Sequence, residues 1–277
     1  RPLRLSWRGE TNAVYLLSIV RRGFEPQVFA ISNRTSACIA NLELASRFDW
    51  SVRQAGSLDS EESHFSTDAQ PPRLLQADGV RNLRDLGGGR TANGRRVRQN
   101  QIFRAASPRL TGVTDAGRAV LRGDLSIRTE LDLRPQRDVL KARGTVLGPG
   151  VGWKSIPLEP GAKVDGIIGG RESFARLFGC LSAKGNLPAL VVDADGGART
   201  ATLAFLLNGL LGVREEDLRR DWNASPDVLK ELVDTLQTMP GTTWESRFES
   251  YARGCGIADS EIAAFRLLML EDERHEP

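Results

Sequence analysis

The chain has 277 residues, of which 40% are hydrophobic and 26% charged, and its formal net charge is +3. This is the composition of an ordinary globular protein, and the length predicts two domains at about 150 residues per domain. No apolar run approaches the ~20 residues of a membrane-spanning helix, which excludes a transmembrane protein. Three cysteines and two histidines are too few and too scattered for a disulfide scaffold, a histidine triad or a zinc site.

Residues 1–68 predict a small β-sandwich. Apolar and polar residues alternate in the segments 3–7, 15–19 and 48–52. Alternation with period two places one face of each strand in a core, and short, regularly spaced strands are typical of a sandwich. Residues 57–72 are polar and acidic and end in two prolines, which is the composition of a linker.

Residues 69–277 predict an α/β domain with a mainly parallel central sheet flanked by helices. Strands are expected at 127–133 and 190–192, and apolar residues between 174 and 181 recur at helical spacing, as a core-facing stripe does. Further helices are expected at 114–121, 199–211, 214–222, 226–237, 244–254 and 258–271. Strands that alternate with helices, followed by a helical tail, indicate a parallel sheet.

The segment 81–109 is strongly basic, with eight arginines and a single acid, Asp85. Such a run is either a solvated basic face or an anion-binding surface, and the bland interpretation is the more common one. Nucleic acid is not an expected partner, because the segment is rich in glycine and offers only Phe103 for stacking on bases.

The loop at 193–199 has the pattern of an anion-binding site. A buried strand ends at Val192, a short turn contains Gly196 and Gly197, and a helix begins near Arg199. The helix start directs unpaired N–H groups and about half a positive charge into the loop. Arg199 can add a bidentate grip on phosphate, sulfate or a carboxylate.

From residue 78 to about residue 270 the chain resembles the cysteine-dependent tyrosine phosphatases. The resemblance is greatest to the bacterial branch that acts on phosphotyrosine, phosphoinositides or inositol phosphates. The matching blocks are Asp-Gly-Val-Arg-Asn-Leu-Arg-Asp-Leu-Gly-Gly at 78–88, Asn-Gly-Arg-Arg-Val at 93–97, Ile-Phe-Arg-Ala at 102–105, Ile-Arg-Thr-Glu-Leu-Asp-Leu-Arg at 127–134, and the helix with its end at 202–213. The resemblance implies a tyrosine-phosphatase-like fold.

The phosphate loop departs from the family pattern at the positions that carry the chemistry. The family has His-Cys, five residues and Arg-Thr, and Asp before the arginine is the general acid of this branch. Arg199 and Thr200 match, but Val192 stands at the histidine position, Asp193 at the nucleophile position and Ala198 at the acid position. Ala194, Asp195, Gly196 and Gly197 complete the loop, and Asp195 is a carboxylate where a small neutral residue is usual.

No cysteine replaces the missing nucleophile. The residues six positions after Cys38, Cys180 and Cys255 are Leu44, Asn186 and Glu261, so the chain has no Cys-x5-Arg signature. The sequence therefore predicts a protein that lacks phosphatase activity and acts as a binding or structural module for an anionic ligand or a protein partner.

Asp193 is expected to occupy the anion site itself. Its carboxylate would accept loop N–H groups and pair with Arg199, whereas a bound phosphate dianion would meet the charges of Asp193 and Asp195. Two unit charges 4 Å apart interact with about 4 kcal/mol at an effective dielectric constant of 20.

Four further residues fall in the matched blocks and could form the wall of the site. They are Arg84, Asp85, Asp132 and Arg134, and their alternative role is a structural set of ion pairs. Asp165, in a glycine-rich loop, could mimic a mobile general acid, although a solvated aspartate is the commoner case.

A different chemistry would use both aspartates. Residues 191–196 also resemble the first motif of haloacid-dehalogenase-type phosphotransferases, in which the first aspartate is the nucleophile and Mg²⁺ neutralises the phosphate. Gly197 departs from that motif, and no downstream lysine or paired-acid motif follows. The alternative function is thus a phosphatase with Asp193 as nucleophile and Mg²⁺ as cofactor; otherwise no cofactor is expected.

The first domain resembles a small fibronectin-III-like or immunoglobulin-like sandwich. Phosphatases of the bacterial branch with such a leading domain are typically exported, so the resemblance implies an exported or periplasmic protein.

Overall fold

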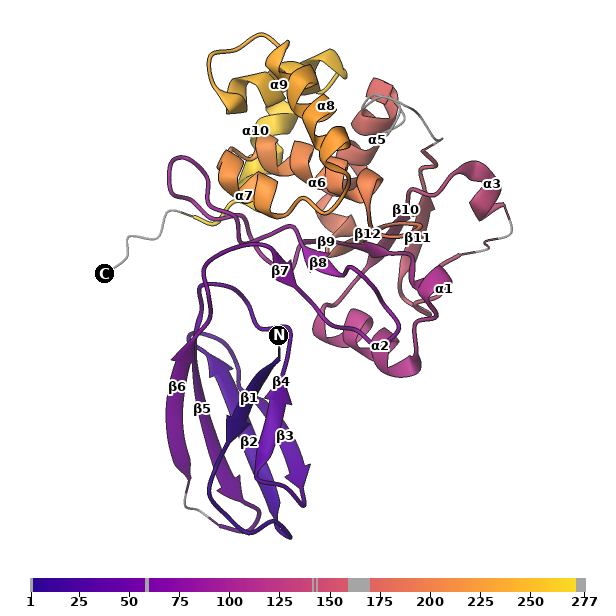
Figure 1. Ribbon diagram of the computed structural model, residues 1–277. Coiled ribbons are helices and arrows are strands. Elements are labelled where there is room, and N and C mark those ends of the chain that lie inside the picture. The colour runs from indigo at the N-terminus through magenta and orange to yellow at the C-terminus, as the bar shows by residue number, and fades with distance from the viewer. Residues whose placement is uncertain (1, 58–59, 141, 143, 159–169, 273–277) are drawn as a thin grey trace. The chain divides into compact units, whose positions relative to one another are not determined.

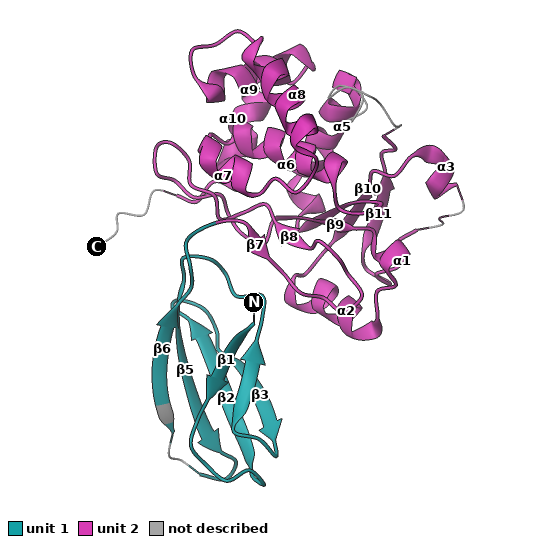
Figure 2. Cartoon of the chain, viewed as in Figure 1, with its two compact units in different colours: residues 1–70 teal, residues 71–277 magenta. Residues whose placement is uncertain are grey.

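The computed structural model describes residues 2–57, 60–140, 142, 144–158 and 170–272 (Figure 1). The chain divides into two compact units, residues 1–70 and residues 71–277 (Figure 2). In the described ranges, no helix has both the length and the apolar character needed to cross a bilayer.

The first unit consists of two antiparallel sheets. One sheet has four strands in the order β3-β2-β5-β6, and the other pairs β1 with β4. The strands are β1 (Leu3–Ser6), β2 (Val14–Arg21), β3 (Gln27–Ser32), β4 (Ser36–Ile39), β5 (Arg47–Gln54) and β6 (Glu61–Ser66).

The core of the first unit follows from the alternation in the sequence. In β2, Tyr15, Leu17 and Ile19 are at most 4% exposed, and the residues between them are partly exposed. They share one apolar cluster with residues of β5 and with Leu5 and Trp7 at the other sheet. The alternating segments therefore form strands with one buried face, packed as a sandwich.

The second unit contains a six-stranded sheet in the order β11-β10-β12-β9-β8-β7. The pairs β11–β10, β10–β12 and β12–β9 are parallel, whereas β8 and β7 are antiparallel additions at one edge. The predicted α/β fold with a mainly parallel sheet is confirmed. The strands are β7 (Arg73–Leu74), β8 (Arg84–Asp85), β9 (Ile102–Ala106), β10 (Thr129–Asp132), β11 (Gly152–Ser155) and β12 (Ala189–Asp193).

Helices α5 to α10 lie on one side of this sheet and α2 on the other (Figure 1). The expected helix at 114–121 is a short α-helix that continues as a π-helical turn. The helices are α1 (Pro108–Thr111), α2 (Asp115–Ala119), the π turn η1 (Val120–Asp124), α3 (Gln136–Val139), α5 (Gly170–Ser182), the 3₁₀ turn η2 (Lys184–Asn186), α6 (Ala198–Leu210), α7 (Glu215–Arg220), α8 (Pro226–Gln237), α9 (Trp244–Gly254) and α10 (Asp259–Met269).

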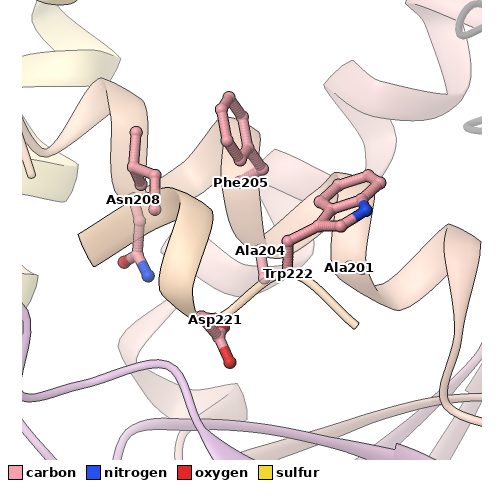
Figure 3. Close-up of a pocket in the computed structure, with 7 residues that line it drawn as sticks. Ala201, Ala204, Phe205, Asn208, Asp221 and Trp222 are labelled. Atoms are coloured by element: carbon pink, nitrogen blue, oxygen red, sulfur yellow. The ribbon is translucent and has the colours of Figure 1, made fainter. Parts of the chain in front are cut away.

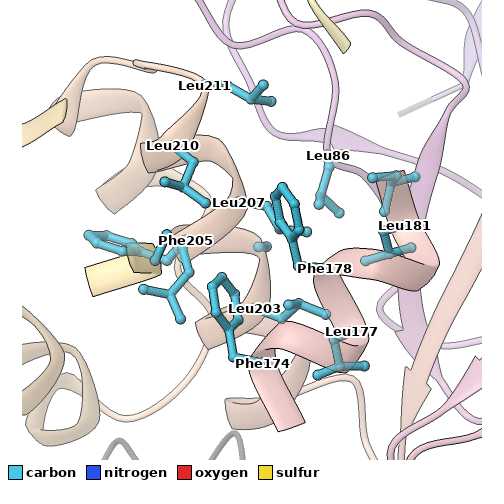
Figure 4. Packing of buried hydrophobic residues seen from close by; sticks show 14 of the residues in the cluster. Leu86, Phe174, Leu177, Phe178, Leu181, Leu203, Phe205, Leu207, Leu210 and Leu211 are labelled. Atoms are coloured by element: carbon cyan, nitrogen blue, oxygen red, sulfur yellow. The ribbon is translucent and has the colours of Figure 1, made fainter. Parts of the chain in front are cut away.

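Strand β12 is buried on both faces, which explains its unbroken apolar sequence. Val191 packs in the cluster beneath α5 and α6, and Leu190 and Val192 pack in the cluster on the α2 side. Figure 4 shows Phe174 and Phe178 of α5 among the leucines of α6. Every residue from 200 to 210 of α6 is buried, so this helix is central to the core.

Candidate functional site

The loop between β12 and α6 is folded tightly against the neighbouring strand β9. β12 ends at Asp193, and α6 begins at Ala198. Gly196 has a φ of +71°, and a Cβ at this position would lie 2.6 Å from the backbone nitrogen of Ala106. Only glycine tolerates both the left-handed conformation and this close approach. The N–H of Ser107 donates to the carbonyl of Asp193 at 2.8 Å and fixes the loop on β9.

The side chain of Asp193 is turned into its own loop. Asp193 is 1% exposed, and its Oδ1 accepts a hydrogen bond from the N–H of Gly196 at 2.5 Å. Asp195 is exposed, and its Oδ1 accepts from the N–H of Gly197 at 2.9 Å. Two successive loop N–H groups, of the kind that would bind an anion, are therefore engaged by carboxylates of the chain itself.

Burial raises the pKa of the Asp193 carboxyl group, and the negative charge of Asp195 raises it further. The N–H groups of Gly196 and Gly197 and the charge of Arg199 lower the pKa but do not outweigh the loss of hydration. Asp193 therefore holds its proton more tightly than an exposed aspartate does.

Arg199, in the first turn of α6, does not form the expected ion pair with Asp193. No Asp or Glu oxygen of the described residues lies within 4.0 Å of its guanidinium nitrogens. Its Nε is buried without a hydrogen-bond partner. The physical reason is that the short aspartate side chain is held by an amide only three residues along the chain. Arg199 is left with an unsatisfied donor beside the loop.

The remaining predicted loop residues lie where their sequence positions require. Ala194 is exposed, and Gly197 and Ala198 are half-buried. Thr200 is 1% exposed, and its Oγ1 donates to the carbonyl of Gly197 at 3.2 Å. Val192, at the family's histidine position, is fully buried in β12. None of these residues supplies a proton donor at the position of the general acid.

The loop carbonyls are held by asparagines from two other segments. Asn82 donates through Nδ2 to the carbonyl of Asp195 at 2.7 Å. Asn223 donates through Nδ2 to the carbonyl of Gly196 at 3.0 Å, and its Oδ1 accepts from Arg104 at 2.8 Å. The backbone of the loop is therefore braced from outside, independently of any group bound within it.

The buried Arg104 pairs with the half-buried Asp221, a contact that the sequence did not indicate. Arg104 is 1% exposed, and its Nη2 donates to Oδ1 of Asp221 at 2.8 Å and to the Asp221 carbonyl at 2.7 Å. Arg84 also reaches Oδ1 of Asp221, at 3.3 Å. Burial and the charge of Arg104 lower the pKa of Arg84. The signal available in the sequence was an arginine within the otherwise apolar strand at 102–106.

The four expected wall residues lie in three separate ion-pair groups, one of which joins Asp132 to Arg134. Arg84 belongs to the group just described. Asp85 accepts from Arg73 at 2.7 Å and from the N–H of Gly87 at 2.8 Å. Asp132 accepts from Arg134 through Nη2 at 2.6 Å and through Nε at 2.9 Å. Both aspartates are at most 2% exposed, so these pairs lie within the fold.

The basic segment 81–109 does not form a continuous solvated face. Only Arg81, Arg90 and Arg109 of its arginines are exposed, and Arg104 is buried. Several others donate to backbone carbonyls: Arg95 to Glu271 at 3.0 Å, Arg96 to Gly88 at 2.6 Å and Arg98 to Leu270 at 2.9 Å. Much of the local positive charge thus serves to fasten loops and the end of the chain.

A small pocket lies between α6 and α7, and no residue of the loop 193–199 lines it (Figure 3). Its walls include Phe205 and Trp222, whose rings are nearly perpendicular with centroids 6.0 Å apart. The lining residues are Ala201, Ala204, Phe205, Asn208, Leu218, Asp221 and Trp222. The pocket lies outside the loop and shares Asp221 with the ion pair of Arg104.

None of the three cysteines belongs to the loop. Cys38 is exposed in β4, Cys180 is half-buried in α5 and Cys255 is buried after α9. Within the described residues, no group of three or more His, Cys, Asp or Glu side chains is arranged to hold a metal ion. Asp165 lies outside the described residues.

A mostly parallel sheet, a strand-loop-helix unit and an arginine at the helix start together define a tyrosine-phosphatase-like α/β fold. A family model described as the tyrosine phosphatase family matches residues 75–265, more than half of the chain, and the chain belongs to this family. No curated protein matches the chain. Among solved structures, the chain is similar to the core catalytic domain of the PP-IP phosphatase SIW14 from S. cerevisiae in complex with citrate, at 15% identity and a TM-score of 0.34. That match covers 48% of this chain and 84% of the other.

Proposed function

We propose that this chain is a catalytically inactive member of its family that acts as a binding or structural module. The observation that carries the proposal is the carboxylate of Asp193 at the nucleophile position, 1% exposed and hydrogen-bonded to the N–H of Gly196. Cysteine phosphatases attack phosphorus with a thiolate and hold the phosphate oxygens with loop N–H groups and an arginine. Here the thiolate is missing, and its site contains a competing acceptor.

Electrostatics also opposes a phosphate dianion in this loop. Asp193 and Asp195 add two carboxylates next to one cation, Arg199. A single carboxylate 4 Å from a unit negative charge costs about 4 kcal/mol at an effective dielectric constant of 20, which is about a thousandfold in affinity. The raised pKa of Asp193 relieves this repulsion only when the carboxyl group is protonated.

The binding or structural role is supported by how the matched charged residues are used. Arg84, Asp85, Asp132 and Arg134 all lie in ion pairs with their own chain. Such pairs maintain a fold without taking part in turnover. The unsatisfied Nε of Arg199 and the three exposed arginines of the segment 81–109 (Arg81, Arg90 and Arg109) are groups available to an anionic ligand or an acidic partner surface.

A phosphatase assay on the wild type and a restored variant tests the proposal. The restored variant carries Val192→His, Asp193→Cys, Asp195→Gly and Ala198→Asp, and the matched control has Asp193→Ser with the other three changes. With p-nitrophenyl phosphate, we expect no turnover by the wild type or the control and measurable turnover by the restored variant. Thermal unfolding of all three shows whether each is folded.

Turnover by the wild type without added metal would overturn the proposal. A second candidate function rests on the aspartate pair at the end of β12, Asp193 and Asp195, which fits a phosphatase with an aspartyl nucleophile and Mg²⁺. Its substrate would be phosphotyrosine, a phosphoinositide or an inositol phosphate. Turnover by the wild type that requires Mg²⁺ and disappears in Asp193→Asn would establish this alternative.

A further inference from the structure

Strand β3 forms an open edge of the four-stranded sheet in the first unit. The sheet order places β3 and β6 at its two edges. All residues of β3 are exposed except Ile31, which is half-buried, and Val28 is 61% exposed. Within the described residues, β3 pairs only with β2. An open edge presents unpaired N–H and C=O groups that can pair with another strand.

The two edges of this sheet differ in their protection. Proteins block open edges with charged residues or proline within the strand. β6 carries the exposed residues Glu62 and His64. β3 consists of Gln-Val-Phe-Ala-Ile-Ser and has neither a charge nor a proline within it. Pro26 precedes β3 and limits pairing to the residues that follow it. β3 is therefore the unprotected edge.

The charges that flank β3 are complementary to a second copy of the same strand. Glu25 lies two residues before the strand and Arg34 two residues after it, and both are exposed. Neither forms an ion pair with another residue in the described ranges. If two copies of β3 run antiparallel, Glu25 of each copy lies beside Arg34 of the other.

We propose that β3 is a homodimer interface, at which two copies of this chain pair antiparallel and continue the sheet across a two-fold axis. Directly opposite residues of antiparallel strands share a face of the sheet, and the two-fold axis keeps each residue and its copy on the same face. The axis must therefore pass beside one residue that faces its own copy, and Phe29 or Ala30 is this residue at the middle of β3. In either register Glu25 lies opposite a neighbour of the other copy's Arg34. Both charges lie outside the strand, where the left-handed φ of +58° at Asn33 ends the alternation of faces and lets the two side chains meet. A single short strand pair buries a small area, so the dimer is a reversible one.

Sedimentation velocity of the full chain over a concentration series tests this interface. We expect the wild type to form dimers as its concentration rises. Val28→Lys places a charge on the edge strand and shifts the protein to monomer, whereas Leu267→Lys, at a 75% exposed position on α10, does not. A wild type that stays monomeric at every concentration, or a dimer that Val28→Lys leaves unchanged, would overturn the proposal.

Charge reversal outside the strand identifies the partner as a second copy. Glu25→Arg alone and Arg34→Glu alone each replace two attractive pairs by two repulsive ones, because the axis repeats every contact. We expect each change to weaken the dimer by about tenfold or more. An equimolar mixture of the two variants restores both pairs and forms a heterodimer. If the mixture stays monomeric while the wild type dimerises, β3 does not meet a copy of itself in this arrangement.

Discussion

Arg134→Met tests whether the buried pair with Asp132 serves the stability of the fold. Arg134 is 2% and Asp132 0% exposed, and their closest atoms, Nη2 and Oδ2, are 2.6 Å apart. Removing one partner of a buried ion pair leaves an uncompensated charge and costs about 3–5 kcal/mol. We expect the lower end of this range, because the backbone N–H of residue 134 still donates to Oδ1 of Asp132 at 3.1 Å.

The free energy of unfolding of the second unit, from equilibrium urea titration and thermal melting, measures this loss. For a unit of about 200 residues, a loss of about 3 kcal/mol lowers the melting temperature by roughly 6–12 °C. The double variant Asp132→Asn with Arg134→Met removes both charges, and we expect it to recover most of the loss. Arg137→Met is the control, because the Arg137 side chain is 73% exposed and its ion pair is worth at most about 1 kcal/mol.

The reasoning is refuted if Arg134→Met costs less than about 1 kcal/mol, the range of an exposed ion pair. It is also refuted if the double variant is as unstable as the single one. A small loss would mean that Arg134 is not needed for stability and is available for binding. A double variant as unstable as the single one would mean that the guanidinium contributes through packing alone.

Three further predictions concern the loop and α6. Asp193→Asn removes a carboxyl group whose pKa is raised in the folded protein. Because the folded wild type keeps this proton to higher pH than the unfolded chain does, its stability falls as pH rises from about 4. The stability of the variant relative to the wild type should therefore increase between about pH 4 and pH 7 in urea titrations. Gly196→Ala should lower the free energy of unfolding by about 2–4 kcal/mol, since it combines left-handed strain with a backbone clash. The control is Gly94→Ala, where a Cβ meets nothing within 4 Å, and it should lose about 1–2 kcal/mol from left-handed strain alone. Thermal melting measures both. Gly209→Ala would bring a Cβ within 2.3 Å of the Phe248 ring, and calorimetry should show a net loss, because overpacking by about 1–3 kcal/mol exceeds the helix propensity gained.

The elements with long apolar patterns could be predicted from the sequence. The run at 190–192 is the centre of β12, and the helix expected at 199–211 is α6, Ala198–Leu210. The short strands β7 and β8 have only two residues each, too few for any periodicity. They exist because β8 pairs with β9 and β7 with β8, which is information the local sequence does not contain.

The candidate site could be predicted where it depends on neighbouring residues. The bond from the N–H of Gly196 to Asp193 spans three residues, and a tight turn makes such a contact predictable. Arg104 and Asp221 are 117 residues apart, so nothing in the local pattern of either indicated the other. The expected pairing of Asp193 with Arg199 was wrong, because spacing along the chain does not say whether a short side chain bonds to its own loop first.

How the loop is held explains why its shape does not depend on the missing thiolate. The carbonyls of residues 193, 195 and 196 accept from Ser107, Asn82 and Asn223, none of which lies in the loop. These contacts hold the backbone from outside, whereas an anion would be bound from inside by N–H groups. Replacing cysteine by aspartate therefore changes the occupant of the loop without removing what shapes it. This is why we expect four substitutions within the loop and its flanks to be sufficient for turnover.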